Sequence, residues 1–210
     1  MLTRKNLISN LISNGVLKTR VIIEAFQKVD RQNFVPENLR AEAYGDYPLP
    51  IGYSQTISQP TTVAFMLELL QPRPGDKILD VGFGSAWTTA LLAYIVSQKK
   101  GGRVVAIELI PEVKKIGERN IEKYNLINDG VVKTICGDGS RGYLKEAPYD
   151  KILVSAAAEE IPPKLLQQLA IGGRMVLPIN NSIWQITKTA VDKFQSQEFP
   201  GFVFVPLRHI

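Results

Sequence analysis

The sequence predicts an α/β fold whose sheet is mostly parallel and gains an antiparallel edge near the C-terminus. Two observations predict this class. From residue 77 to residue 169, short apolar runs alternate with segments of helical periodicity, the pattern of a parallel sheet covered by helices on both faces. After residue 174, three apolar runs follow one another without a helical segment between them, which indicates antiparallel pairing.

Each element of this fold can be placed along the chain. The predicted helices span residues 16–29, a segment that begins at residue 60, and residues 86–96, 111–124 and 162–169. The predicted parallel strands span residues 77–81, 103–108, 131–136 and 149–155. The predicted antiparallel strands span residues 174–179, 182–188 and 202–207, and Asn180-Asn181 forms a hairpin turn between the first two.

We expect one domain that spans residues 1–210. Residues 1–59 supply N-terminal helices, which pack on the sheet, and a long loop, and residues 60–210 form the α/β core. A loop of this length inside a compact domain is usually functional, so we expect the segment before residue 60 to contribute to substrate binding.

Composition excludes several classes of function. Cys136 is the only cysteine and His209 the only histidine, so the sequence predicts no disulfide and no metal site. We find neither a signal-peptide pattern nor an apolar run long enough to span a bilayer, and we expect a cytoplasmic protein without a membrane partner. The net charge of +5 permits nucleic-acid binding, but the basic residues are spread along the chain. We therefore expect no nucleic-acid partner, and a monomer.

Small and acidic residues follow the predicted parallel strands at the point where each strand ends. Asp80 lies near the end of the first strand, and Gly82 and Gly84 follow it, where glycine allows a sharp turn and a close approach to a ligand. Glu108 ends the next strand and can accept hydrogen bonds from the ribose hydroxyls of an adenosine. Residues 137–139 close the third strand. Since ligands of such sheets bind at these strand ends, the residues together predict an adenosine cofactor.

The turn alone fits a nicotinamide dinucleotide, S-adenosylmethionine or no ligand at all. Three features favour S-adenosylmethionine. The full three-glycine phosphate fingerprint is missing. The carboxylate of Asp80 suits an ammonium group better than a pyrophosphate. Asp138, between two glycines, can accept a hydrogen bond from an adenine amino group, although by itself the same segment also fits a simple Asx turn.

Motifs along almost the whole chain carry a family resemblance. The most specific is Gln55-Thr56-Ile57-Ser58-Gln59-Pro60, before the glycine turn. Others, in chain order, are Val29-Asp30-Arg31-Gln32-Asn33-Phe34-Val35-Pro36, Ala43-Tyr44-Gly45-Asp46-Tyr47-Pro48, Gly137-Asp138-Gly139, Ala147-Pro148-Tyr149-Asp150 and Phe204-Val205-Pro206-Leu207. With these motifs the chain resembles the protein-L-isoaspartate O-methyltransferases. The resemblance implies a Rossmann-like, S-adenosylmethionine-dependent methyltransferase sheet in which the order of the last strands is reversed. It also implies a repair activity, the transfer of a methyl group to the free carboxylate of L-isoaspartyl residues in damaged proteins and peptides.

The resemblance also implies roles for individual residues. Ser58 matches the active-site serine of the family, and Thr56 and Ile57 match residues that line its isoaspartyl pocket. The positions that match the cofactor site are Asp80, Gly82, Gly84, Ser85, Glu108, Asp138 and Gly139.

Small residues at the end of another predicted strand also point to the substrate. Val154, Ser155 and Ala156 lie there, and we expect them to leave room for a substrate backbone, although tight packing of sheet on helix explains them equally well. Two residues of the glycine turn depart from the family pattern. Phe83 replaces a small residue and Ala86 replaces a glycine, so we expect a negative φ at Ala86.

The chemistry of this reaction suits a serine better than a base. The carboxylate that attacks has a reference pKa of roughly 3.5–4, so it is ionised at neutral pH and needs no general base. An arginine on the attacking oxygen would stabilise the ground state more than the transition state, because the oxygen loses its charge as it reacts. A hydroxyl from Ser58 orients the oxygen more weakly. The alternative is that Ser58 only caps the helix that begins at residue 60.

Three rival functions stay open at this point. The basic composition suggests a nucleic-acid methyltransferase, but the Asn/Asp-Pro-Pro-aromatic motif of many such enzymes is missing after residue 150. Phe83 and Ala86 suggest a catalytically impaired protein that binds S-adenosylmethionine. A nicotinamide-dependent dehydrogenase is the third.

Overall fold

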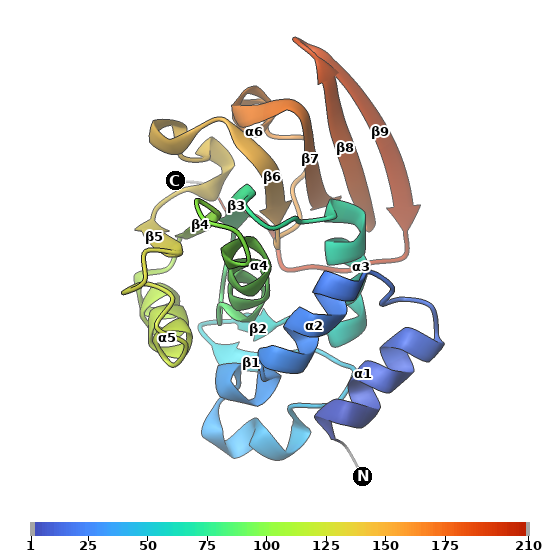
Figure 1. Cartoon of the computed structure of the whole chain (residues 1–210), viewed down its shortest axis with the longest axis vertical. Helices are drawn as coiled ribbons and strands as arrows, with labels where there is room; N and C mark the ends of the chain where they lie inside the picture. The colour runs from blue at the N-terminus through green and yellow to red at the C-terminus, as the bar shows by residue number, and fades with distance from the viewer. Residues whose placement is uncertain (1–2, 209–210) are drawn as a thin grey trace.

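The computed structural model describes residues 3–208 and contains a seven-stranded sheet, with helices packed on it, and a separate two-stranded hairpin (Figure 1). The helices are α1 (Arg4–Ser13), α2 (Arg20–Lys28), α3 (Pro60–Leu70), α4 (Trp87–Ser97), α5 (Pro111–Glu122) and α6 (Pro163–Gln168). The hairpin strands are β1 (Leu49–Gly52) and β2 (Gln55–Ile57). The strands of the large sheet are β3 (Lys77–Val81), β4 (Arg103–Glu108), β5 (Val132–Cys136), β6 (Tyr149–Val154), β7 (Leu169–Ile179), β8 (Ser182–Ala190) and β9 (Lys193–Pro200).

The order of the large sheet is β5-β4-β3-β6-β7-β8-β9. The pairs from β5 to β7 are parallel, and β8 and β9 are added antiparallel. The predicted fold class is thus confirmed, and β7, β8 and β9 follow one another in chain order at one edge. From β3 the chain adds β4 and β5 on one side and then crosses back to add β6 on the other side of β3, so a crevice opens at the carboxyl ends of β3, β4 and β6.

The two faces of the sheet are covered unequally. One face packs Ile78, Val104 and Leu153 into a large core shared with helices α1 to α5. The other face packs Leu79 and Val105 into a smaller core to which α6 contributes. The N-terminal helices therefore pack on the sheet as predicted, and they thicken the first of its two faces.

The segment between α2 and α3 is more ordered than a loop. It contains two short 3-10 helices, Arg31–Phe34 and Glu37–Glu42, and the β1–β2 hairpin. Sequence periodicity misses these pieces because each is too short to show a repeat.

One predicted strand is wrong. Residues 202–207 run extended and make only an isolated bridge, between Pro206 and Ala157. The third antiparallel strand is instead β9, which pairs with β8 along its length. The sequence hides β9 because almost every residue of this edge strand is exposed, so its side chains show no apolar alternation. The hairpin turn at Asn180-Asn181 is confirmed, since Ile179 pairs with Ser182.

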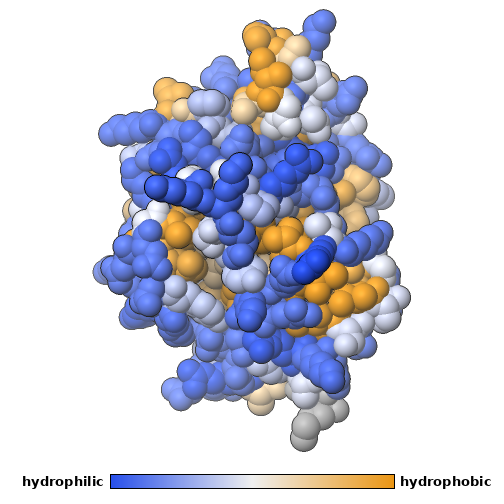
Figure 2. All heavy atoms as spheres, in the orientation of Figure 1, coloured by the Kyte–Doolittle hydropathy of each residue, from blue (hydrophilic) through white to orange (hydrophobic). Residues whose placement is uncertain are grey.

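Figure 2 shows a face that is mostly hydrophilic, with apolar atoms at the top, where the β8–β9 hairpin of Figure 1 ends. Val191 and Phe194, at this end, are 69% and 37% exposed. In the part of the chain that the structure describes, no helix is both long enough and apolar enough to cross a membrane.

Candidate active site

The chain turns sharply between β3 and α4. The N–H groups of Gly82 and Phe83 donate to the carbonyl oxygen of Ile107 on β4, at 2.8 and 3.3 Å, so the turn is tied to the neighbouring strand. Gly82 and Gly84 have φ values of 77° and 54°, in the left-handed region that glycine adopts at little cost. The predicted glycine turn is therefore present, and it directs backbone toward the carboxyl ends of β3 and β4.

Glu108 is held against this turn. Its Oε2 accepts from the N–H of Gly84 at 3.0 Å and its Oε1 accepts from the N–H of Ile110 at 3.1 Å. The residue is only 7% exposed, yet it lines the cleft described next. The two bonds fix the direction of the carboxylate and leave its remaining lone pairs for a ligand.

A cleft that is open to solvent lies at the ends of β3, β4 and β6. Ten of the predicted site residues line it: Thr56, Ile57, Ser58, Gly82, Gly84, Ser85, Glu108, Gly139, Ser155 and Ala156. The structure thus brings together residues from the glycine turn, from three strand ends and from residues 43–59, which we call the substrate loop.

Three predicted residues do not line this cleft. Val154 is fully buried in the smaller core. Asp80 is also fully buried, and its Oδ2 accepts from the hydroxyl of Thr89 at 2.6 Å, while its Oδ1 has no hydrogen-bond partner among the described residues. Burial raises the pKa of Asp80 to about 7; the Thr89 hydrogen bond opposes this shift and the charge of Glu108 adds to it. Its contact with an ammonium group stays a prediction.

Asp138 is the third predicted site residue that does not line the cleft. Its Oδ1 accepts from the N–H and the hydroxyl of Ser140, at 3.0 and 2.6 Å, and its Oδ2 pairs with Arg141 at 3.2 Å. The Asx turn is therefore formed, and contact with an adenine stays a prediction. Gly139 does line the cleft, but it is also a packing residue, because a Cβ there would lie 2.3 Å from a methyl group of Val81.

A second hollow, a groove of about 730 Å³, adjoins the cleft. Thr56, Ser58, Ser155 and Val205 line both. Ser58 therefore lies between the cleft beside the glycine turn and an open groove at the surface.

Ser58 does not cap α3. The N-cap residue is Gln59, without a capping side chain, and the carboxylate of Asp46 takes that role from 15 positions upstream. It accepts from the N–H of Thr61 at 2.8 Å and from its hydroxyl at 2.6 Å. The capping alternative for Ser58 is wrong, so its hydroxyl is left to face the cleft and the groove.

Comparison with known proteins decides the family. Residues 2–209 match the model of the protein-L-isoaspartate(D-aspartate) O-methyltransferases. The protein-L-isoaspartate O-methyltransferase of Methanopyrus kandleri is 45% identical over 208 residues, which cover 97% of this chain and 90% of that protein. The second such enzyme of Archaeoglobus fulgidus is 47% identical over 193 residues, 90% of this chain and 86% of that protein. This chain belongs to that family.

A solved structure agrees. A protein-L-isoaspartate O-methyltransferase from Plasmodium falciparum, in complex with S-adenosyl-L-homocysteine, superposes with a TM-score of 0.87 at 26% identity and covers 98% of both chains. The methyltransferase fold and the enzyme class predicted from the sequence are thereby confirmed.

Of the two unusual residues of the turn, Phe83 lines the cleft. The ring of Phe83 packs on α5, where a Cβ on Gly117 would come within 2.5 Å of it, so a glycine in mid-helix makes room for the ring. Ala86 is fully buried and does not line the cleft. The expected negative φ is wrong, however: Ala86 has a φ of 67°, because it still occupies the left-handed position before α4.

One wall of the site is not predictable from the sequence pattern alone. The C-terminal segment returns over the ends of β3 and β6, where the N–H of Ala157 donates to Val205 and the N–H of Leu207 donates back to Ala157. Val205 and Arg208 line the cleft, as does Thr88 in the first turn of α4. The family resemblance of residues 204–207 was the signal that marked this segment. His209 lies outside the described residues.

Proposed function

We propose that the chain transfers the methyl group of S-adenosylmethionine to the free carboxylate of L-isoaspartyl residues in proteins and peptides. One observation carries the proposal. Ser58 and Thr56 line both the cleft beside the glycine turn and the surface groove, so a methyl donor on one side can meet a peptide on the other.

The cleft fits the cofactor chemically. Glu108 offers carboxylate lone pairs to ribose hydroxyls, and the glycine turn and the start of α4 offer N–H groups to a carboxylate. One buried oxygen of Asp80 has no hydrogen-bond partner within residues 3–208, as expected of a residue that stabilises a nearby cation. When bound, S-adenosylmethionine supplies an electrophilic methyl group on a sulfonium.

Ser58 orients the carboxylate that attacks. Its hydroxyl donates a hydrogen bond and lies just before the N-terminus of α3, whose dipole also favours an anion. Asp46 offsets part of that dipole, because its carboxylate already occupies the first N–H of the helix. Ser58 therefore holds the nucleophile in place without the strong stabilisation that a cation would give. The activation free energy stays low, because little ground-state stabilisation is lost when the carboxylate gives up its charge in the transition state.

Alignment is then the main source of catalysis. Holding two reactants in a reactive geometry contributes on the order of 7–11 kcal/mol in favourable cases. Ser155 and Ala156, at the end of β6, keep the meeting point open with small side chains, and Val203 and Phe204 line the groove beyond it.

Labelled S-adenosylmethionine and paired peptides test the proposal. The two peptides differ only in L-isoaspartate against aspartate at one position. Label should appear on the isoaspartyl peptide alone, and mild base should release it, because a methyl ester hydrolyses easily. Label on both peptides, on neither, or on added RNA or DNA instead would reject the proposed substrate.

Three narrower expectations stay proposals as well: a single domain over residues 1–210, a monomer without a nucleic-acid partner, and a cytoplasmic location. Light scattering after size exclusion checks the second against the chain mass of 23.3 kDa. A species of twice that mass would contradict it.

A further inference from the structure

Arg31 is a buried charge that the proposed chemistry does not use. The residue is only 2% exposed, and desolvation lowers the pKa of its guanidinium to about 10. It lines neither the cleft nor the groove. A buried cation is costly unless its hydrogen bonds are nearly complete, so the bonds it makes indicate what it does.

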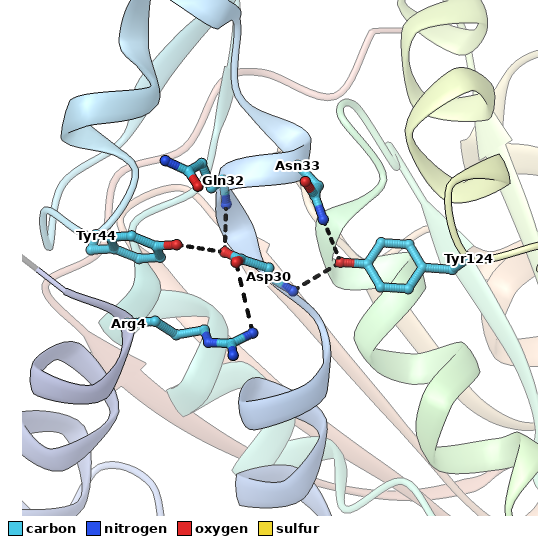
Figure 3. Close-up of polar contacts among 6 residues, drawn as sticks. All are labelled: Arg4, Asp30, Gln32, Asn33, Tyr44 and Tyr124. Carbon is cyan, nitrogen blue, oxygen red and sulfur yellow. Dashed lines mark hydrogen bonds and ion pairs between the residues drawn. The ribbon is translucent and has the colours of Figure 1, made fainter.

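The backbone that carries Arg31 is fixed by its neighbour, Asp30 (Figure 3). The Oδ1 of Asp30 accepts from the N–H of Gln32 at 3.0 Å and from the hydroxyl of Tyr44 at 2.9 Å. The N–H of Asp30 donates to the hydroxyl of Tyr124, just beyond α5, at 3.0 Å. These bonds tie the 3-10 helix that contains Arg31 to the α/β core.

The guanidinium binds four main-chain carbonyl oxygens of the substrate loop. Its Nη1 donates to Ala43 at 2.7 Å and to Gly45 at 3.4 Å. Its Nη2 donates to Tyr47 and to Ser58 itself, each at 3.1 Å. The side chain of Arg31 thus binds the main chain on both sides of the β1–β2 hairpin. One of its four hydrogen bonds is to Ser58.

The guanidinium of Arg31 also lies over Trp87, a residue that lines the cleft. Its Cζ is 5.3 Å from the ring centroid of Trp87, which begins α4 and lines the cleft. Phe26 of α2 packs edge-on against this ring, 5.5 Å away. Arg31 therefore contacts both Ser58 and Trp87, the first residue of the helix that follows the glycine turn.

We propose that Arg31 is a positioning residue, which sets the place of Ser58 relative to the glycine turn. This inference rests on the proposed function. The planar guanidinium donates hydrogen bonds to the substrate loop from its edges and stacks on Trp87 with its face. The ammonium of a lysine cannot make both kinds of contact at once. Asp46, whose charge faces Arg31 and whose carboxylate caps α3, completes the link to the helix that follows Ser58.

A double-mutant cycle between Arg31 and Ser58 tests this role. Arg31→Lys should lower kcat on an isoaspartyl peptide by about 10- to 100-fold, since misplacement of a catalytic group by an ångström has effects of that size. In a Ser58→Ala background the same change should lower kcat by less than about two-fold, because Arg31 acts through Ser58. The affinity for S-adenosylhomocysteine, measured by calorimetry, should change less than kcat.

Arg174→Lys is the matched control. Arg174 is also partly buried, donates its Nη1 to a main-chain carbonyl oxygen, that of Leu69 at 2.9 Å, and lies away from the cleft. Both substitutions should lower the melting temperature, but Arg174→Lys should leave kcat within about two-fold of the wild type. An equal fall in kcat for both would show that Arg31 is only structural.

A second double-mutant cycle, between Asp46→Asn and Ser58→Ala, tests the same role if Arg31→Lys does not fold. Asp46 is exposed, and asparagine still offers an oxygen to the N–H of Thr61, but the charge that faces Arg31 is lost. We expect kcat to fall several-fold with Ser58 present and by less than about two-fold with Ser58→Ala. If the fold-losses in kcat of the two single variants simply multiply in the double variant of either cycle, the role of Arg31 is overturned. An unchanged kcat in both Arg31→Lys and Asp46→Asn would overturn it as well. A wild type that does not methylate the isoaspartyl peptide would reject the proposed function as well.

Discussion

The two walls of the cleft are stabilised in different ways. The cofactor wall is a strand, a glycine turn and a helix, built from main-chain bonds between β3 and β4 and from residues that are almost completely buried. The substrate wall, residues 43–58, contains the β1–β2 hairpin and no helix. Its side chains Leu49, Ile51 and Ile57 are buried too, but its two ends are held by the guanidinium of Arg31 and the carboxylate of Asp46. The substrate wall thus depends on charged side chains in addition to apolar burial, whereas main-chain bonds and burial fix the cofactor wall. Substitutions in the two walls should therefore fail differently.

Glu108→Ala should give the largest loss on the cofactor wall. The change removes the acceptor for two main-chain N–H groups and the expected ribose ligand. Hydrogen bonds to a charged group contribute about 1.5–3 kcal/mol, so affinity for S-adenosylhomocysteine should fall about 100-fold. Calorimetric titration measures it, and Glu112→Ala, an exposed glutamate in α5, should bind within about two-fold of the wild type. An unchanged affinity in Glu108→Ala would place the adenosine elsewhere.

Ser58→Ala should have a smaller effect that is confined to turnover. The hydroxyl orients the attacking carboxylate, so kcat/KM should fall by about 10- to 50-fold. The melting temperature should stay the same, because Asp46 and not Ser58 caps α3. Ser97→Ala, which removes a hydroxyl at the end of α4, should leave both values unchanged. A lower melting temperature with full activity would restore the capping role.

The difference between the walls also explains what could be predicted from the sequence. The parallel strands and the glycine turn are predictable because each is a contiguous run whose burial shows in its own side chains. The substrate wall is not, since Arg31 and Asp46 look like surface charges and their partners lie 12 to 27 and 15 positions away. Strand β9 was missed because its exposed side chains carry no periodic signal. The C-terminal wall was predicted as a strand instead, because residues 202–207 are mostly apolar. Ser58 itself was found only through the family motif.

The pH dependence of stability should report on the cofactor wall through Asp80. Its folded pKa of about 7 lies above the ordinary value of 3.8, so the folded state holds a proton that the unfolded state has lost. Stability should therefore fall as the pH rises from about 4 to about 7, and stay low above that. Between pH 5 and pH 8, wild-type apoprotein should lose roughly 2–3 kcal/mol more than Asp80→Asn in urea titrations. Parallel curves for the two proteins would show that Asp80 is ionised throughout.

Ala86→Gly should give the smallest effect, and one of opposite sign. The left-handed conformation at φ 67° costs a residue with a Cβ roughly 1–2 kcal/mol, whereas glycine adopts it freely but loses more entropy on folding. The net gain should be about 0.5–1 kcal/mol, a rise of about 1–4 °C in the melting temperature for a domain of this size. Ala90→Gly, four residues on in the same helix, should lower stability instead, by about 1 kcal/mol, because helical backbone favours alanine. Since Ala86 does not line the cleft, cofactor affinity should hold in Ala86→Gly; a weaker affinity would mean that the strained turn is itself part of the binding site.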